Sequence, residues 1–262
     1  MQAAGLIVRP GSAQGGAATA SRVMQNGLYV SLSAQVSLER RLETIANNVA
    51  NMNTVGFRGD GVYFSEQVAR AGDSSISYVS PGNSYISRAT GSSVKTNNPF
   101  DVSIQGDGWM AIRAQGGIAY TRDGRMRMSE SGALETLIGN PVLDAGGAPI
   151  VLNPAGGTPT IGGDGMISQD GRQIGAIGLF EIDPKANLVR TENSGVIPDK
   201  PATPILDFTK NGVAQGYVEG ANINPIEEMT KLISLTRNFD GVNSEVSQTE
   251  SSLEDAIKTL GA

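Results

Sequence analysis

The sequence predicts an α+β protein in which a helix at each end of the chain flanks a central, antiparallel β-rich domain. Glycine is spread unevenly. The stretch 28–52 contains none and the stretch 225–260 contains only Gly241, whereas the region from Gly91 to Gly220 contains 22. Because a glycine inside a helix costs about 1 kcal/mol relative to alanine, the two ends can be helical and the middle largely cannot. Both ends also carry an apolar stripe with helical spacing.

The C-terminal helix is expected over residues 225–262. Asn224 can cap the first turn, Pro225 suits the first helical position, and Glu227 places a negative charge where the helix dipole favours one. On a grid of alternating three- and four-residue steps that starts at Met229, seven of ten positions are apolar: Met229, Leu232, Phe239, Val246, Leu253, Ile257 and Leu260. This spacing is close to the 3.5-residue period of a coiled coil.

The N-terminal helix is expected over residues 24–56 and shows the same period. Its stripe steps by four, three, four and three residues, with Leu28 and Leu32 extending it upstream; the stripe itself consists of Leu38, Leu42, Ile45, Val49 and Met52. Gly56 is expected to end the helix, because glycine adopts the left-handed conformation of a C-terminal cap without steric cost.

The two stripes should cover each other. A long helix with a single apolar stripe is not stable alone in water, so the simplest arrangement pairs the two termini as a coiled-coil-like stem. Two helices cannot hide both stripes completely, and copies of the same chain are expected to complete the burial. Before assembly, the termini of a lone subunit should therefore be largely unfolded.

The middle of the chain is divided by turn signals. Residues 91–204 should form the β domain, between an extended connection over 57–90 and a return segment over 205–224. Short apolar runs such as 102–104 and 175–182 predict strands, and hairpin turns are predicted at Asp107-Gly108, Asp123-Gly124, Asp164-Gly165, Asp170-Gly171 and Asn211-Gly212. The Gly- and Ala-rich residues 1–23 are expected to be a disordered extension.

Composition excludes several classes of function. The chain has no cysteine and no histidine, so disulfides, thiolate chemistry, Cys/His zinc sites and His-dependent triads are ruled out. A net charge of -6 argues against non-specific binding to nucleic acid. No run of apolar residues is long enough for a transmembrane helix, and the N-terminus lacks a signal-peptide pattern. No catalytic, cofactor-binding or metal-binding residue is predicted.

Three alternatives were weighed from the residues. Carboxylate pairs such as Asp164/Asp170 could serve a secreted glycoside hydrolase, but both precede glycine as turn residues do, and Glu181/Asp183 fit a solvated strand face. Trp109 is expected in the core rather than in a sugar groove. A calcium-binding β-roll would need several repeats of the glycine-rich motif, and a membrane-surface helix would need a basic polar face, which the acidic C-terminal helix lacks.

An asparagine-rich motif ends the N-terminal helix. Five of the fourteen residues in 45–58 are asparagine or glycine, notably Asn47, Asn48, Asn51 and Gly56. One interpretation is an ordinary helix C-terminus, where these residues are common. The other is a packing motif, in which short amides bridge backbone groups of a neighbouring subunit.

Five separated motifs resemble, in order, those of the flagellar axial proteins, the rod and hook family. They are the asparagine-rich segment 45–58, the aromatic strand 105–109, the hairpins 120–124 and 139–143, and the helix entry 219–225. Segments 24–30 and 252–260 look most like the proximal rod members, with distal rod or hook paralogues as the alternative. The resemblance begins at Met24, so residues 1–23 could also lie upstream of the native start.

The resemblance implies a non-enzymatic structural role in bacterial motility. Such proteins are exported without a cleaved signal by the flagellar type III apparatus, and assemble with copies and other rod proteins into the torque-transmitting rod of the basal body, in the periplasmic space. No nucleic acid, small-molecule substrate, cofactor or membrane insertion is expected. The predicted assembly interface comprises Leu38, Leu42, Ile45, Asn47, Asn48, Val49, Asn51, Gly56, Phe57, Met229, Leu232, Phe239, Val246, Leu253, Ile257 and Leu260.

Overall fold

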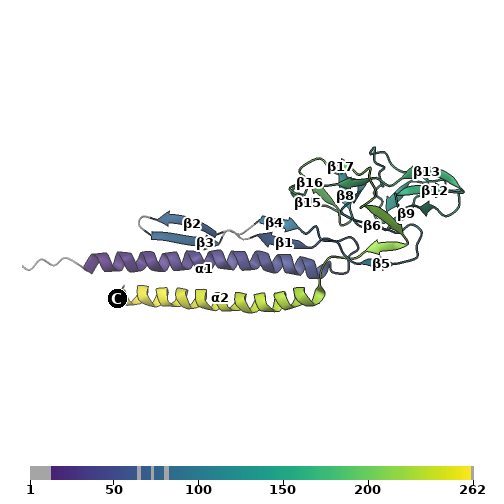
Figure 1. Ribbon diagram of the computed structural model, residues 1–262. Coiled ribbons are helices and arrows are strands. Elements are labelled where there is room, and N and C mark those ends of the chain that lie inside the picture. Colours follow the sequence, from purple (N-terminus) through teal and green to yellow (C-terminus); the bar gives the residue numbers. More distant parts are fainter. Residues whose placement is uncertain (1–12, 64–65, 72–73, 80–82, 261–262) are drawn as a thin grey trace, which may run out of the picture. The chain divides into compact units, whose positions relative to one another are not determined.

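The computed structural model describes residues 13–63, 66–71, 74–79 and 83–260. The order of elements is helix α1 (Ala13–Ala50), strands β1 to β19, and helix α2 (Pro225–Leu260), which confirms the α+β class (Figure 1). Within the described residues the chain divides into two compact units. The helical unit comprises Met1–Glu43, Tyr63–Asn83 and Leu232–Ala262, and the core unit comprises Thr44–Val62 and Ser84–Lys231.

The helical unit brings together the two ends of the chain. The helices α1 and α2 run side by side in it, and the Gln35 side-chain amide donates a 2.9 Å hydrogen bond to Asn243 Oδ1 (Figure 1). Leu235 of α2 is buried. Strands β2 (Glu66–Ala71) and β3 (Ser74–Val79) pair as an antiparallel hairpin in the same unit.

The boundaries of α1 differ from the prediction at both ends. The helix begins at Ala13, so residues 13–23, which were expected to be disordered, are helical; alanines at positions 13, 17, 18 and 20 favour this because alanine has the highest helix propensity. Residues 1–12 lie outside the described residues. The helix ends at Ala50 rather than near Gly56, and turns occupy 51–56.

The start of α2 agrees with the local prediction. Asn224 Oδ1 accepts hydrogen bonds from the backbone N–H groups of Ile226 and Glu227, at 3.1 and 3.4 Å, so the side chain caps the first turn. Lys231 Nζ forms ion pairs with Glu227 Oε1 at 2.7 Å and with Glu228 Oε1 at 2.9 Å, both about one turn earlier in the helix.

The core unit is built on a six-stranded antiparallel sheet with the order β15-β16-β8-β7-β14-β17. Its strands are β7 (Trp109–Ala114), β8 (Gly117–Thr121), β14 (Leu179–Glu181), β15 (Leu188–Arg190), β16 (Val196–Pro198) and β17 (Thr203–Pro204). The antiparallel pairing confirms the antiparallel, β-rich middle that the sequence predicts.

The other strands described form smaller sheets. The two-stranded pairs are β1 (Asp60–Tyr63) with β4 (Asn83–Ile86), β5 (Ser93–Lys95) with β19 (Tyr217–Glu219), β6 (Val102–Gln105) with β18 (Gly212–Gln215), and β9 (Met126–Met128) with β10 (Leu134–Thr136). Strands β11 (Thr160–Ile161), β12 (Met166–Gln169) and β13 (Arg172–Ala176) form a three-stranded sheet. The run expected over 175–182 is split between β13 and β14.

The predicted turns have different outcomes. Asp170 and Gly171 both have positive φ and join β12 to β13, as a two-residue hairpin requires. Gly124, in contrast, is a close-approach position, because an added Cβ would lie 1.8 Å from the Val102 carbonyl oxygen. Asn211 does not form a hairpin with Gly212; its side-chain oxygen accepts hydrogen bonds from the N–H groups of Asp107 and Gly108.

The apolar core lies in the core unit. Its most buried members include Val102, Met110, Ile112, Val142 and Ile167, each with no exposed surface. Trp109 is 3% exposed and belongs to a second apolar cluster on the same sheet, so the prediction that it is a core residue is confirmed.

Candidate assembly surface and helix–core junction

The predicted stripe of α1 is only partly covered. Ile45 is buried, whereas Leu38, Leu42 and Val49 remain half-buried. Such side chains keep apolar surface in water that a further contact could remove. The stripe thus keeps part of its apolar surface exposed.

The covered face of α2 is shifted from the predicted one. Leu235 is the most buried apolar side chain described on this helix, although it lies outside the predicted stripe. Met229, a predicted member, is 46% exposed, while Leu232, Phe239 and Val246 are half-buried. The remaining predicted members lie in the last turns of α2, and their side chains fall outside the described residues: Leu253, Ile257 and Leu260. Leu235 and Val242, which lie four residues before and three residues after the predicted Phe239, share a face with it and were missed by the 3.5-residue grid.

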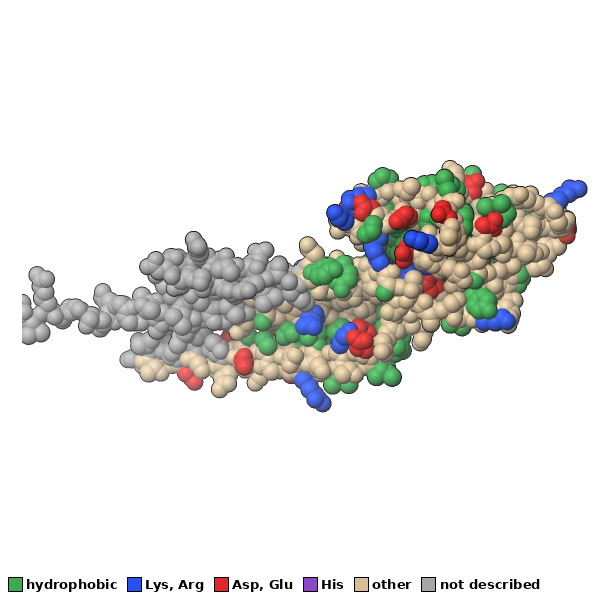
Figure 2. Space-filling view, in the orientation of Figure 1, with side chains coloured by type: hydrophobic (Ala, Val, Ile, Leu, Met, Phe, Trp, Pro, Cys, Tyr) green, Lys and Arg blue, Asp and Glu red, His purple; other side chains and the backbone are tan. Residues whose placement is uncertain are grey.

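Large apolar side chains also face outward along both helices. On α2, Ile226, Met229 and Ile233 are 78%, 46% and 56% exposed; on α1, Leu32 and Val36 are 52% and 37% exposed. Figure 2 shows apolar side chains at the surface of α2. Three apolar residues at i, i+3 and i+7 share one helix face, so α2 presents a second apolar stripe.

The amides of the asparagine-rich motif are used within the chain. The buried Asn48 accepts a 2.8 Å hydrogen bond from the Asp60 N–H and donates a 2.9 Å bond to the Asp60 carbonyl oxygen. Its Nδ2 also donates to Glu228 Oε2, at 3.2 Å, in the first turn of α2. A single side chain thus joins the end of α1, strand β1 and the start of α2.

The neighbouring asparagines support this arrangement. Asn47 Nδ2 donates to Asp60 Oδ2 at 2.7 Å, and Asn51 Nδ2 donates to the Asn47 carbonyl oxygen at 3.0 Å. The motif therefore contains the end of α1, as the first interpretation has it, and its amides bridge elements of one chain; a bridge to a neighbouring subunit stays a prediction.

A buried ionic cluster lies beside this motif. Glu219 Oε1 is 2.8 Å from Arg58 Nη2, and Glu219 Oε2 is 2.9 Å from Arg122 Nη1. Each of the three side chains is at most 3% exposed. The two guanidinium groups lie 5.5 and 5.6 Å from the centre of the Trp109 ring, within the range of a cation–π contact.

Backbone groups complete the cluster. Arg122 donates to the carbonyl oxygens of Ile104 and Gly106, Arg58 donates to that of Ala89, and Glu219 Oε1 accepts from the Gly91 N–H. These bonds tie together five segments that are distant in sequence. Burying ions is favourable only when such bonds replace the lost hydration.

The cluster holds two positive charges and one negative charge. Burial lowers the pKa of Arg58 to about 10, although the attraction of Glu219 opposes that change, and burial also lowers the pKa of Arg122. Both arginines stay charged at neutral pH, so Glu219 is the group that makes their burial tolerable.

The backbone between α1 and this cluster approaches the core closely. Gly56 has φ +68°, its N–H donates a 2.7 Å hydrogen bond to the Glu219 carbonyl oxygen, and an added Cβ would lie 2.2 Å from Asp123 N. Glycine is required here by the approach of another segment, rather than as the helix cap that was predicted. The next residue, Phe57, is 3% exposed.

Sequence reasoning missed the charged members of this junction. Arg58, Trp109, Arg122 and Glu219 lie in four of the five motifs that suggested the family, yet none of these motifs predicted an ion pair. A signal was available in the sequence: Arg58, Arg122 and Glu219 are charged residues of three motifs, and neither a turn nor a helix end requires a charge at these positions. We call this cluster together with Asn48 and Asp60 the helix–core junction.

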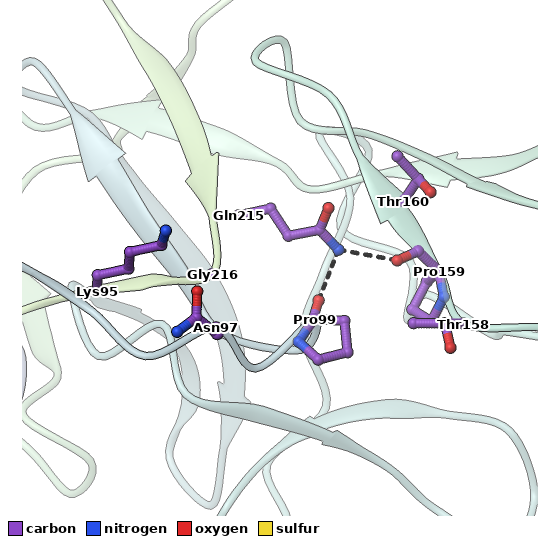
Figure 3. Close-up of a pocket in the computed structure, with 8 residues that line it drawn as sticks. All are labelled: Lys95, Asn97, Pro99, Thr158, Pro159, Thr160, Gln215 and Gly216. Atoms are coloured by element: carbon purple, nitrogen blue, oxygen red, sulfur yellow. Dashed lines mark hydrogen bonds between the residues drawn. The ribbon is translucent and has the colours of Figure 1, made fainter.

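A shallow groove of the core unit holds no comparable site. It is lined by Lys95, Asn97, Pro99, Thr158, Pro159, Thr160, Gln215 and Gly216 (Figure 3). Gln215 Nε2 donates to the carbonyl oxygens of Pro99 and Pro159, at 2.7 and 2.8 Å, and its Oε1 accepts from the Ile161 N–H. The glutamine therefore ties loops together, and both of its N–H donors are used within the chain.

The rejected enzyme residues have structural partners. Asp164 accepts a hydrogen bond from the Met166 N–H in a turn, and Asp183 pairs with Lys200 at 2.8 Å. Among the described residues, no three His, Cys, Asp or Glu side chains gather closely enough to hold a metal ion. In the same part of the chain, no helix has the length and apolarity needed to cross a membrane.

Long terminal helices with exposed apolar faces, joined to a β core by a buried polar junction, define a structural protein of the axial class. Three family models agree: "Flagella basal body rod protein" matches residues 28–58, "Flagellar hook protein FlgE/F/G D1 domain" matches 103–169, and "Flagellar basal body rod FlgEFG protein C-terminal" matches 214–260.

Curated relatives narrow this class. The chain is 52% identical over 239 residues to the flagellar basal-body rod protein FlgF of Mesorhizobium japonicum, covering 91% of this chain and 99% of the relative. It is 47% identical over 238 residues to FlgF of Rhizobium meliloti, with 91% and 99% covered, and 29% identical over 264 residues to FlgG of Bacillus subtilis, with 89% and 98% covered. The chain belongs to the FlgF family of flagellar basal-body rod proteins.

It is therefore a structural subunit of the flagellar basal body and not an enzyme. The glycoside hydrolase alternative has no support from these relatives. The higher identity to FlgF than to FlgG also favours a proximal rod member over the distal paralogue.

Proposed function

We propose that the chain assembles through its terminal helices, with copies of itself and other rod proteins, into the proximal part of the torque-transmitting rod. The observation that carries this proposal is the second apolar face of each helix. On α2, Leu235 lies nine residues after Ile226, which is two and a half helical turns, so the buried and the outward apolar residues occupy opposite faces.

A helix with two apolar faces suits a position between neighbours. The inner face packs within the chain, and the outer face is left for another helix. Burying one isoleucine contributes about 1.5–3 kcal/mol, so a few such contacts per subunit would hold an assembly of many copies. In this proposal the half-buried Leu38, Leu42 and Phe239 serve both faces, whereas the predicted interface residues Gly56 and Phe57 lie beyond the end of α1 and pack within the chain.

The remaining expectations follow from this role. The terminal segments 24–56 and 225–262 would form a coiled-coil-like stem, and the chain would be exported by the type III apparatus without a cleaved signal and act in the periplasmic space. The family supports these proposals, because its curated members are basal-body rod proteins. The net charge of -6 supports the proposal that nucleic acid is not a partner.

Ile233→Asp tests the outer face. The substitution places a carboxylate where a neighbouring helix should pack, and should weaken each contact by at least about tenfold. The variant is expected to fold but not to restore motility or complete rods in a strain that lacks the gene. Ser234→Asp adds the same charge at the adjacent, exposed position and should restore both. Normal basal bodies with Ile233→Asp, seen by electron microscopy, would contradict the proposal.

A further inference from the structure

The turn between β15 and β16 has an unusual backbone. Asn193 and Ser194 both have positive φ, +56° and +51°, and the Gly195 N–H donates to the Glu192 carbonyl oxygen at 3.0 Å. A two-residue turn of this type favours Asn followed by Gly, because the second position is strained for a residue with a Cβ. Asn193 fits the preference and Ser194 does not.

The side chain of Ser194 makes a contact that glycine could not. Its Oγ donates a 3.0 Å hydrogen bond to the carbonyl oxygen of Val55, in the segment that follows α1. The turn itself is held to β8, because Thr121 Oγ1 donates a 2.7 Å bond to the Asn193 carbonyl oxygen. The strained residue thus connects the central sheet with the exit of the helix.

Arg190 makes a second contact from the same hairpin. Its Nη2 donates to the Arg58 carbonyl oxygen and to Asp60 Oδ1, both at 2.6 Å, and its guanidinium lies 4.2 Å from the centre of the Phe57 ring. Asp60 in turn accepts the hydrogen bond from Asn47. The hairpin therefore holds the segment 55–60 at both of its ends.

We propose that the β15–β16 hairpin is a positioning clamp, which fixes the last turns of α1, residues 44–50, to the β core. Backbone strain at a residue that surrounding contacts over-determine is typical of a functional position. The clamp is a property of the single chain. Only its consequence, that subunits with a loose helix end assemble poorly, rests on the proposed function.

Two substitutions of Ser194 distinguish the effect of its side-chain hydrogen bond from the effect of its strained backbone. Ser194→Gly removes the hydroxyl and relieves the strain, so its thermal midpoint should equal or exceed that of the unsubstituted protein. Ser194→Ala removes the hydroxyl but keeps the strain, so its midpoint should fall. In both variants, amide hydrogen exchange over 51–60 should become about fivefold faster, the effect of losing one hydrogen bond.

Asn97→Gly is the matched control. Asn97, which is exposed, has a positive φ of +61° as Ser194 has, so the substitution relieves strain of the same kind in the core unit, away from the hairpin. Its midpoint should rise while exchange over 51–60 stays unchanged. Unchanged exchange in both Ser194 variants would overturn the clamp.

Motility then tests the consequence. Ser194→Gly should restore motility less well than Asn97→Gly, although both are stably folded. Equal motility would overturn the link to assembly and leave the exchange result standing. If the unsubstituted protein itself forms no rod, the proposed function fails, which the exchange measurement on the monomer does not address.

Discussion

The helical unit and the core unit use their apolar residues in different ways. In the core unit, residues such as Met110, Ile112 and Ile167 have no exposed surface, and the chain closes this core by itself. In the described part of the helical unit, Leu235 is buried, whereas Leu32, Val36 and Ile233 are 52%, 37% and 56% exposed. The core unit encloses a buried core of its own, although side chains such as Val189 and Leu206 stay exposed on it, whereas few of the large apolar side chains described in the helical unit are buried.

The helix–core junction belongs to the core unit. It fastens the last turns of α1 and the first turn of α2 to the β core through side chains such as Asn48, Arg58 and Glu219. Under the proposed function, this junction supplies a rigid base for helices whose outer parts pack against neighbouring subunits. The following predictions test this contrast, from the largest expected effect to the smallest.

Glu219→Ala should lower the free energy of unfolding of the core unit by about 3–5 kcal/mol, because it leaves two buried guanidinium groups without their carboxylate. Trp109, the single tryptophan, lies against both arginines and reports the transition by fluorescence during urea denaturation. Glu181→Ala removes an exposed glutamate of the same unit and should change the stability by less than about 0.5 kcal/mol. A loss below about 1 kcal/mol for Glu219→Ala would show that the junction does not depend on this pairing.

Met110→Ala and Leu235→Ala compare the two units directly. Met110→Ala should lower the stability reported by Trp109 by about 2–5 kcal/mol, the usual effect of truncating a fully buried side chain. Leu235→Ala should leave this transition unchanged and reduce assembly instead.

The expectation that the termini are largely unfolded in a lone subunit is checked in the same samples by hydrogen exchange. Strong protection across residues 232–260 of the monomer would rule it out.

The smallest expected effect is the contribution of Tyr120 to the pH dependence of stability. Burial raises its pKa above the ordinary value of 10.0, so the unfolded chain loses this proton at a lower pH than the folded chain does. Its contribution to stability is therefore present below pH 10 and is lost as the pH rises further. Urea midpoints should fall more between pH 9 and pH 11 in the unsubstituted protein than in Tyr120→Phe, whereas Tyr63→Phe, at a 64% exposed position, should behave like the unsubstituted protein. An equal fall of the urea midpoint in all three proteins would contradict a raised pKa of Tyr120 in the folded state.

Local signals predicted local structure well. The cap of α2 by Asn224 and the Asp170-Gly171 hairpin depend on residues that are close in sequence, and both are confirmed. The left-handed conformation predicted for Gly56 is confirmed by its φ of +68°, but the glycine lies beyond the helix end, and the segment around Asp123 that excludes a side chain there is remote in sequence. The seam of α2 was placed on Thr236 rather than on the preceding Leu235, because the prediction continued a regular grid from Met229, whereas tertiary packing decides which face is buried.

The sequence alone determined the class of protein, the helical ends, the β-rich middle and the exclusion of cysteine and histidine chemistry, because composition, spacing and turn residues act over short distances. Only the tertiary structure decided which charged groups meet. Arg58, Arg122 and Glu219 come from segments far apart in the chain, and their pairing depends on the approach of backbones that no periodicity describes. The same holds for Ser194, whose strained backbone has meaning only beside Val55.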